Sequence, residues 1–207
     1  MYITAIEPFT KGKKKIFSEK GYLFWLYDSE IREYGIEEDT ILSDSIIDTI
    51  ENDIVLKRAK QKVLRMLERM DRTKYELLRK LKDAGYTEAI SSQAIEYAYN
   101  YNYIDDERFA VNYVRDNCTV RSKKAIANAL AMKGIDKELV EKAYSFVRYD
   151  VCDNPEEAAI NKDIAKKLNG REISEYDEKF RQKLAASLFR KGYSYELIKK
   201  KINFSEY

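Results

Sequence analysis

One short pattern occurs three times in this 207-residue chain and constrains its fold more than any other feature. A glycine is followed by an apolar residue and then by a residue that can cap a helix, at Gly85-Tyr86-Thr87, Gly134-Ile135-Asp136 and Gly192-Tyr193-Ser194. Glycine ends helices because it adopts the left-handed conformation at little cost, while Thr, Asp and Ser accept hydrogen bonds from the free N–H groups that begin a helix. Each copy therefore predicts a tight turn between two helices.

Apolar residues stand at the same distances from each of the three glycines. A Leu or Ile lies eight and four residues before the glycine, and another lies five residues after it. The sets are Leu77, Leu81 and Ile90, then Ile126, Leu130 and Leu139, then Leu184, Leu188 and Leu197. Residues four apart share one face of a helix, so these positions predict a buried face in three copies of one helical unit.

A further helix start precedes each of the last two copies. Asp105 follows Gly85 by 20 residues, and Asn154, with Pro155 behind it, follows Gly134 by the same 20. An N-cap residue at each of these two points starts an additional helix, so we expect each repeat to hold three helices. In the first repeat, Thr73 and Glu76 form a capping box at the start of the second helix. We expect repeats at residues 54–103, 104–150 and 151–207, with nine additional residues in the last one near 169–174.

The N-terminal residues 1–53 have a different pattern. Short β-prone runs at 2–9, 15–18 and 22–27 are separated by segments that contain Gly12 and Gly21, which predicts a hairpin or a three-stranded meander. Asp28-Ser29 can cap a short helix that ends near Gly35, and Ser43 or Asp44 can start another. Only 7 Gly and 2 Pro, with 36% charged residues, suit long exposed helices. The sequence therefore predicts a mainly α fold: three tandem three-helix repeats in an elongated array, preceded by a small N-terminal β-hairpin or meander element.

Positive charge recurs with the repeat. Residues 57–82 hold 11 basic and 3 acidic residues (+8), residues 121–137 hold 5 and 1 (+4), and residues 179–207 hold 8 and 2 (+6), within a chain total of only +2. We expect these blocks on the middle helix of every repeat, so that stacking the repeats would line them up as one positive stripe suited to phosphates. The alternative is that the Lys and Arg side chains only solvate exposed helix faces. The candidate DNA- or filament-binding residues are Arg72, Lys74, Arg79, Lys80, Arg121, Lys123, Lys124, Lys179, Lys183, Arg190 and Lys191.

The chain lacks the usual chemistry of enzymes. It has no histidine and no G-x-x-x-x-G-K loop for a nucleotide, so we expect neither catalytic residues nor a cofactor. Cys118 and Cys152 are its only cysteines and no apolar run approaches a membrane span, which predicts a cytoplasmic, membrane-free monomer with reduced thiols. Asp105, Asp106 and Glu107 could suggest a metal site. Consecutive helical residues diverge by about 100° each, however, so we interpret Asp105 as an N-cap.

Four tyrosines alternate at Tyr97, Tyr99, Tyr101 and Tyr103. On a continuous helix Tyr97 and Tyr101 share one face and Tyr99 and Tyr103 another, so the four cannot make one platform for stacking bases. We expect them to pack in the core or between repeats.

Three segments together resemble the RecX family of recombination regulators. They are the YIDDERFA stretch from Tyr103 to Ala110, the Arg72-Thr73-x-x-Glu76-Leu77 helix start, and LAMKGI from Leu130 to Ile135. Their order and spacing fit as well, and the resemblance covers most of the chain. One departure is Ser122, where many relatives have a glycine before the middle helix of the second repeat.

The resemblance implies a non-catalytic protein that binds the RecA recombinase filament and lies in its groove. Such a protein restrains the ATPase, strand-exchange and co-protease activities of RecA in recombination and DNA repair, and has some affinity for single- or double-stranded DNA. One alternative is a helix-turn-helix transcription regulator, which would concentrate Asn, Gln and Arg on one recognition helix and commonly dimerise. A metal-dependent nuclease built on the acids at 105–107 is another.

Overall fold

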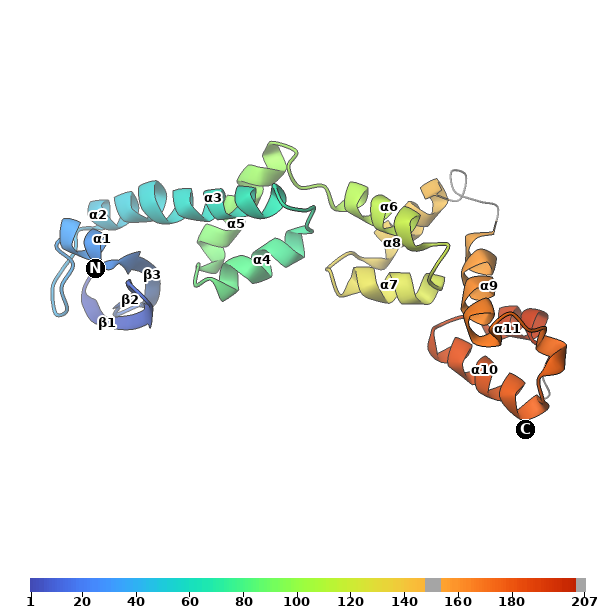
Figure 1. The fold of residues 1–207 in the computed structure, drawn as a ribbon. Coiled ribbons are helices and arrows are strands. Elements are labelled where there is room, and N and C mark those ends of the chain that lie inside the picture. The colour runs from blue at the N-terminus through green and yellow to red at the C-terminus, as the bar shows by residue number, and fades with distance from the viewer. Residues whose placement is uncertain (148–153, 204–207) are drawn as a thin grey trace. The chain divides into compact units, whose positions relative to one another are not determined.

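The structure, a computed structural model, describes residues 1–147 and 154–203 (Figure 1). The chain divides into two compact units, Met1–Asp105 and Asp106–Tyr207. Helices dominate both units, and the strands belong to the first. The mainly α architecture expected from the sequence is confirmed.

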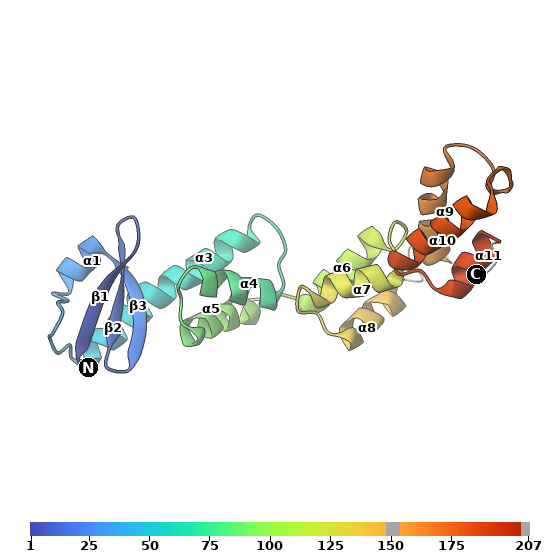
Figure 2. The same ribbon diagram turned by 90° about the horizontal axis from the view of Figure 1, so that it is seen from below.

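Unit 1 begins with a three-stranded antiparallel sheet of β1 (Ile3–Thr10), β2 (Lys13–Ser18) and β3 (Gly21–Tyr27), in the order β1-β2-β3 (Figure 2). Gly12 and Gly21, at φ of 72° and 100°, supply the left-handed residues that the two tight connections need. Ile16 on the central strand pairs with Ile6 on one side and Phe24 on the other. The expected meander is therefore present.

A short helix and then one long helix follow the sheet. α1 spans Asp28–Glu33, and Tyr27, whose N–H donates to Glu30 at 2.8 Å, takes the capping position expected for Asp28 or Ser29. Ser43 caps α2 (Asp44–Thr49) by accepting from the N–H of Ile46. The backbone stays helical through a π-helical segment (Ile50–Leu56) into α3 (Lys57–Leu67), which is the first helix of repeat 1.

The three-helix repeats are confirmed. Repeat 1 consists of α3, α4 (Lys74–Asp83) and α5 (Glu88–Asn100). Repeat 2 consists of α6 (Asp106–Asn117), α7 (Lys123–Ala131) and α8 (Lys137–Val147). Repeat 3 consists of α9 (Pro155–Leu168), α10 (Glu178–Arg190) and α11 (Tyr195–Lys201), with a 3₁₀ turn (Ile173–Glu175) between its first two helices. That turn lies where the additional residues of the last repeat were expected.

The glycine turns have the predicted geometry. Gly85, Gly134 and Gly192 have φ of 83°, 80° and 92°, and each follows the end of a middle helix. The residue after each glycine donates its N–H back to the last buried leucine of the helix, at 3.1, 3.0 and 3.3 Å. Thr87, Asp136 and Ser194 then cap the third helices by accepting from the N–H three residues on. The same local chemistry thus forms all three turns.

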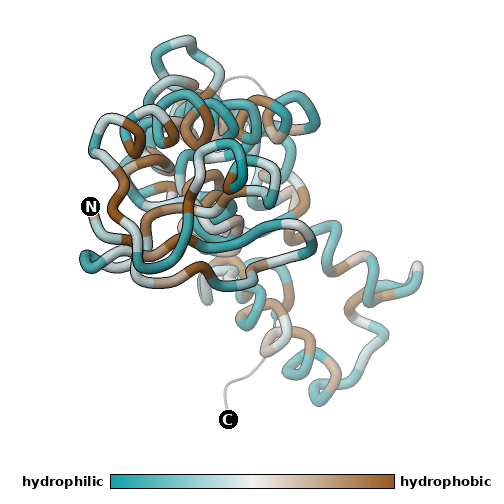
Figure 3. Tube along the Cα trace, turned by 90° about the vertical axis from the view of Figure 1, so that its left-hand side faces the viewer, coloured by the Kyte–Doolittle hydropathy of each residue, from teal (hydrophilic) through white to brown (hydrophobic). Residues whose placement is uncertain are grey.

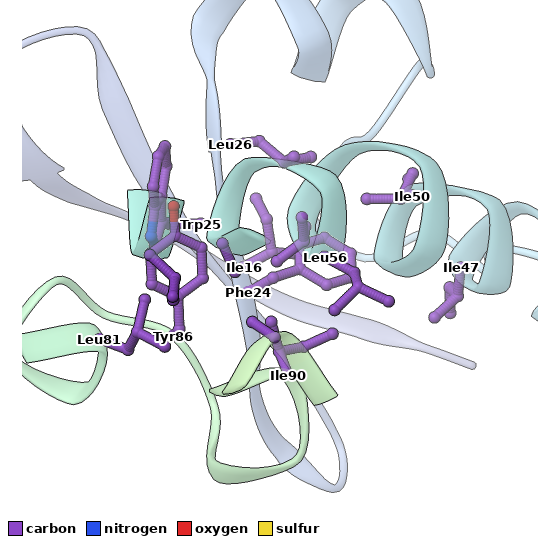
Figure 4. Close-up of a cluster of buried hydrophobic side chains, with 14 of the residues drawn as sticks. Ile16, Phe24, Trp25, Leu26, Ile47, Ile50, Leu56, Leu81, Tyr86 and Ile90 are labelled. Atoms are coloured by element: carbon purple, nitrogen blue, oxygen red, sulfur yellow. The ribbon is translucent and has the colours of Figure 1, made fainter. Parts of the chain in front are cut away.

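The sheet and repeat 1 share one hydrophobic core. Ile16, Phe24 and Leu26 from the strands pack with helix residues such as Leu56 (Figure 4). Trp25 lies beside Tyr86, the apolar residue of the first glycine turn, with ring centroids 5.7 Å apart (Figure 4). The turn of repeat 1 is therefore anchored on the sheet by aromatic packing.

Repeats 2 and 3 keep separate cores, around Ile126 and Leu130 in one and Leu184 and Leu188 in the other. Hydrophobic and hydrophilic residues alternate along the helices of the chain, as expected of amphipathic helices with one buried face (Figure 3). Leu139 and Leu197, at the predicted core position of the third helices, are half-buried.

The expectation for the tyrosine run was wrong for three of its four members. Tyr99, Tyr101 and Tyr103 have exposed fractions of 61%, 60% and 49%, so they are not core residues. Tyr99 lies within α5 on its exposed face, whereas α5 ends at Asn100 and Asn102 adopts a left-handed φ of 57°, which removes the helical spacing assumed for Tyr101 and Tyr103. The rings of Tyr101 and Tyr103 stack at 6.2 Å as a result.

Two further predictions concern the cysteines and membrane-spanning helices. Cys118 is buried and forms no disulfide within the described residues, and Cys152 lies outside them. Among residues 1–147 and 154–203, no helix is long and apolar enough to cross a membrane.

Candidate nucleic-acid interface

The middle helices α4, α7 and α10 present the predicted basic residues, and each begins at a capped position. Thr73 caps α4, Ser122 caps α7 and Asp177 caps α10, each accepting from a backbone N–H in the first turn. In repeat 1 the basic block 57–82 covers α3 as well as α4, so it is broader than the middle helix expected to hold it. The caps place the basic side chains that follow them at defined positions in each repeat.

A groove of about 390 Å³ in unit 2 gathers four of the predicted residues. Arg121 and Lys124 come from the start of α7, whereas Arg190 and Lys191 come from the end of α10. Exposed Val120 and Phe189 lie at the same groove. The structure therefore brings together cations that are far apart in the sequence, next to apolar surface.

Lys191 is neutralised within the groove. Its ammonium lies 2.6 Å from Asp163, a carboxylate whose side chain is only 11% exposed and which also accepts from the Tyr193 hydroxyl at 2.9 Å. Burial, together with the hydrogen bond to Asp163, raises the pKa of Tyr193, so this hydroxyl stays protonated as a donor. Lys191 therefore contributes little net charge to the groove.

Three other cations keep their charge. Lys124 and Arg190 are exposed and make no ion pair within the described part of the chain, and Arg121 donates to the neutral Tyr113 hydroxyl at 3.3 Å. The positive end of the α7 dipole adds to the potential beside Arg121 and Lys124. Arg121, Lys124 and Arg190, which we call the groove cations, are the charges best placed here to contact an anion.

Ser122 holds the two sides of the groove together. It is buried, and its hydroxyl accepts from the N–H of Ala125 at 3.1 Å while donating to the Lys191 carbonyl at 2.6 Å. A Cβ at Gly192 would lie 3.0 Å from both the Ser122 hydroxyl and the Lys124 Cβ, so a glycine is needed for this approach. The serine that departs from the RecX pattern thus joins repeat 3 to repeat 2.

Lys123 has a different environment from its neighbours. Its ammonium pairs with Glu141 at 2.6 Å, and its backbone N–H donates to Glu156 at 3.2 Å. It lines a separate pocket of about 540 Å³ that also contains Glu157, whose pKa is lowered by hydrogen bonds from Lys200 and Lys201. Because these three carboxylates surround it, Lys123 is a weaker candidate for a phosphate contact than Arg121 or Lys124.

The remaining predicted residues lie on α10 and in repeat 1. Lys179 and Lys183 are exposed and, at spacings of four and then seven, share a face of α10 with Arg190. Lys74 and Arg79 are exposed on α4. A single stripe through all three repeats stays a prediction.

Arg72 and Lys80 are half-buried and line a pocket in unit 1 that sequence reasoning missed. The same pocket takes Lys13 from the sheet and Arg58 from α3. The excess of basic residues over 57–82 was the available signal, but assigning it to the middle helix left α3 out. The strand residue had no signal because its proximity is purely tertiary.

Asp105 directly precedes α6, the position expected of an N-cap, and its hydrogen bond to the helix stays a prediction. Within the residues that the structure describes, no three His, Cys, Asp or Glu side chains cluster closely enough to hold a metal ion. The acids at 105–107 therefore do not converge on one point.

Comparison with known protein families assigns all three repeats. Models described as the first, second and third three-helix domains of RecX match residues 59–97, 105–143 and 156–202, in that order. The chain belongs to the RecX family. The RecX domains coincide with the helical repeats, and each includes one glycine turn.

Individual relatives and solved structures agree. Proteins named Regulatory protein RecX from Clostridium botulinum Eklund 17B and from Caldanaerobacter subterraneus are each 29% identical to this chain. Both alignments cover 99% of the chain, and they cover 98% and 100% of the respective relatives. A crystal structure of regulatory protein RecX has a TM-score of 0.62 at 23% identity over 98% of both chains. RecX from Lactobacillus salivarius has a TM-score of 0.57 at 24% identity, covering 72% of this chain and 94% of that one. The RecX fold therefore extends over the whole length.

Proposed function

We propose that this protein regulates the RecA recombinase by binding its filament and restraining its ATPase, strand-exchange and co-protease activities in recombination and DNA repair. The observation that carries the proposal is the ordered succession of all three RecX domains along the chain. Relatives that align over nearly their whole length carry the name Regulatory protein RecX. The protein acts in the cytoplasm by binding alone, as a monomer without catalysis or a cofactor.

Contact with DNA is the electrostatic part of the proposal. The groove cations Arg121, Lys124 and Arg190 carry unneutralised charge, and Lys179 and Lys183 extend it along α10. Such cations contact phosphates without reading bases, which suits a protein that works on many sequences. The intervening segments 83–120 and 138–178 each have a net charge of −5, and they supply a surface for basic regions of the partner protein.

The third helices bear on the alternative of a helix-turn-helix transcription regulator. A major-groove reader needs Arg, Lys, Asn or Gln along its recognition helix. α5 is the third helix of repeat 1, and its 13 residues include neither Lys nor Arg. Two of the lysines on α11, Lys200 and Lys201, pair with Glu157. These features favour phosphate contact over sequence reading.

RecA ATPase activity on single-stranded DNA, with this protein titrated in, tests the regulatory role. We expect the activity to fall, and a fall at substoichiometric protein indicates end-capping or disassembly of the filament. Unchanged activity at saturating protein would contradict the proposal. Sequence-specific binding to duplex DNA in the same preparation would instead support the transcription regulator.

Charge reversal tests the DNA contact. Sequence alone selects Arg121, Lys123 and Lys124, but the ion pair of Lys123 makes Arg190 the better third position. The variant R121E/K124E/R190E should bind single-stranded DNA more weakly, and the slope of log K against log salt should decrease by about 2, at roughly 0.7 per phosphate contact.

The matched control is K162E/K166E/K167E, which makes the same charge change at exposed positions of α9 outside the groove. We expect it to retain most of the slope. Equal losses of affinity and slope in both triple variants would show that the groove has no special role.

A further inference from the structure

Unit 1 contains a pocket of about 480 Å³ between the sheet and repeat 1, and its charged lining is entirely basic. Strands β2 and β3 and helix α3 contribute to its lining, together with residues of the α3–α4 connection, of α4 and of the turn after it. No Asp or Glu is among the residues that line it. The cations are Lys13, Arg58, Lys62, Arg65, Arg69, Arg72 and Lys80.

Aromatic rings hold two of these cations in place. The Lys13 ammonium lies 4.1 Å from the centroid of Trp25, and the Arg58 guanidinium lies 4.4 Å from it. Arg58 also pairs with Glu30, which lies outside the lining, while Lys13 has only ring partners in the described structure. The cation–π contacts of Lys13 position its charge without cancelling it, unlike the ion pairs of Arg58 with Glu30 and of Lys123 and Lys191 in unit 2. The pocket therefore keeps a concentrated positive charge.

Three donors of the lining are buried without a hydrogen-bond partner within the described residues. They are the indole Nε1 of Trp25, one Nη of Arg58 and the Nε of Arg72. An unsatisfied buried donor is costly, and donors of this kind in native proteins usually face an acceptor. Like charges crowded around one pocket are costly as well. A ligand with several anionic oxygens would relieve both costs.

We propose that this pocket binds a ligand that carries two or more phosphate groups. Guanidinium groups match phosphate oxygens in geometry, and the seven cations exceed what Glu30, the carboxylate paired with Arg58, can neutralise. The phosphates belong either to a DNA strand or to a free polyphosphate such as a nucleotide. The inference rests on the proposed function only in the first case, where the pocket adds a contact in unit 1 to the groove in unit 2.

The pocket has a built-in reporter because Trp25 is the only tryptophan of the chain. We expect the fluorescence of the full-length protein to change saturably on titration with inorganic triphosphate, with a single-stranded oligonucleotide, or with both. A response to the oligonucleotide alone identifies a nucleic-acid strand as the ligand, and a response to triphosphate alone identifies a free polyphosphate. No saturable change with either probe overturns the inference.

Two matched variants separate the pocket from general surface charge. K62E/R65E reverses two lining residues of α3 and should weaken binding of the responding probe at least about tenfold. K57E/K82E makes the same charge change at exposed positions on α3 and α4 that do not line the pocket, and should weaken it less than about threefold. Equal weakening in the two variants overturns the inference.

Hydrogen exchange of the unmodified protein covers the case in which K62E/R65E fails to fold. Triphosphate or oligonucleotide should slow exchange in β3 and around Arg72, and no slowing there overturns the inference. The result stays separable from the proposed function. If neither probe changes the fluorescence but RecA is inhibited normally, the regulatory role is retained without the phosphate site. If a probe binds but RecA activity is unaffected, only the phosphate site is supported.

Discussion

The turns at Gly85 and Gly192 have nearly the same backbone but dock on different surroundings. A Cβ at Gly85 would lie 2.9 Å from the Phe9 ring and 3.0 Å from the Trp25 ring, and the Tyr22 hydroxyl donates to the Gly85 carbonyl at 2.5 Å. At Gly192 the neighbours are Lys124 and Ser122, and the hydroxyl that donates, to the Lys191 carbonyl, belongs to serine. The same glycine turn therefore packs against aromatic rings in unit 1 and against Ser122 and Lys124 in unit 2.

This difference matters for how the parts of each unit depend on one another. In unit 1 the turn belongs to a core shared by the sheet and the repeat. In unit 2 the repeats have separate cores, and the described contacts between them include the hydrogen bonds of Ser122 and of Lys123 with Glu156. Repeat proteins gain stability from each unit and from each interface. We therefore expect the sheet and repeat 1 to unfold together, and repeat 3 to separate from repeat 2 more readily.

Gly85→Ala should have the largest effect on stability. The left-handed backbone costs an alanine about 1–2 kcal/mol, and overpacking against Phe9 and Trp25 adds about 1–3 kcal/mol. We expect a total loss of about 3 kcal/mol in urea unfolding of the full chain followed by Trp25 fluorescence. Gly35→Ala is the control, because its φ of 59° carries the backbone strain with nothing within 4 Å of the added Cβ. Equal losses of unfolding free energy in the two variants would show that the packing of Gly85 against Phe9 and Trp25 is unimportant.

Gly192→Ala should destabilise repeat 3 by about 2 kcal/mol, from the same backbone strain and a Cβ contact with Lys124. Hydrogen exchange in α10 and α11 measures the effect, while the Trp25 transition should stay unchanged. Gly170→Ala has a similar φ of 83° but open space around its Cβ, so it isolates the strain. A shift of the Trp25 transition as large as that in repeat 3 would contradict the independence of the two regions.

Ser122→Ala should cost about 1–2 kcal/mol, because it removes both the cap of α7 and the donor to the Lys191 carbonyl. Ser194→Ala removes a cap alone and should cost about 1 kcal/mol. Hydrogen exchange should show that Ser122→Ala loosens both α7 and the Gly192 turn, whereas Ser194→Ala loosens only α11. If the amides of the Gly192 turn stay protected from exchange in Ser122→Ala, the hydrogen bond from Ser122 to the Lys191 carbonyl does not stabilise that turn.

Alkaline pH should weaken unit 1 through two tyrosines beside the Gly85 turn. Burial raises the pKa of Tyr22 and of Tyr86 to about 12, above the usual value of 10.0. The folded state therefore holds these protons more tightly than the unfolded state, so their stabilisation is complete below pH 10 and is lost as the pH rises toward 12. Urea midpoints by Trp25 fluorescence at pH 9, 10 and 11 should decline, and Tyr22→Phe should make the decline shallower. An unchanged decline in Tyr22→Phe would exclude Tyr22 as its source.

Local chemistry made the repeats predictable from the sequence. A glycine, an apolar residue and a capping residue specify their turn within a few residues, and the confirmed caps at Thr87, Asp136 and Ser194 accept hydrogen bonds only three positions away. The tyrosine run shows the limit of this reasoning. Helical spacing stopped applying once α5 ended at Asn100, and the left-handed Asn102 carries no obligatory sequence signal.

The candidate sites depended on long-range placement. The basic residues could be chosen from the sequence, but their effective charge could not, because Lys123 meets Glu141 and Lys191 meets Asp163 only in the folded chain. The positions of Lys13 and Arg58 over Trp25 likewise depend on contacts between elements, of β2 with β3 for Lys13 and of α3 with β3 for Arg58.

The sequence by itself determined the helix ends and starts at the three glycine turns and that one three-helix unit recurs, since capping and left-handed glycine act within a single turn of backbone. Only the tertiary structure decided which cations keep their charge. Electrostatic interactions act through space, so a lysine beside a buried carboxylate and a lysine over an indole ring can look alike along the chain.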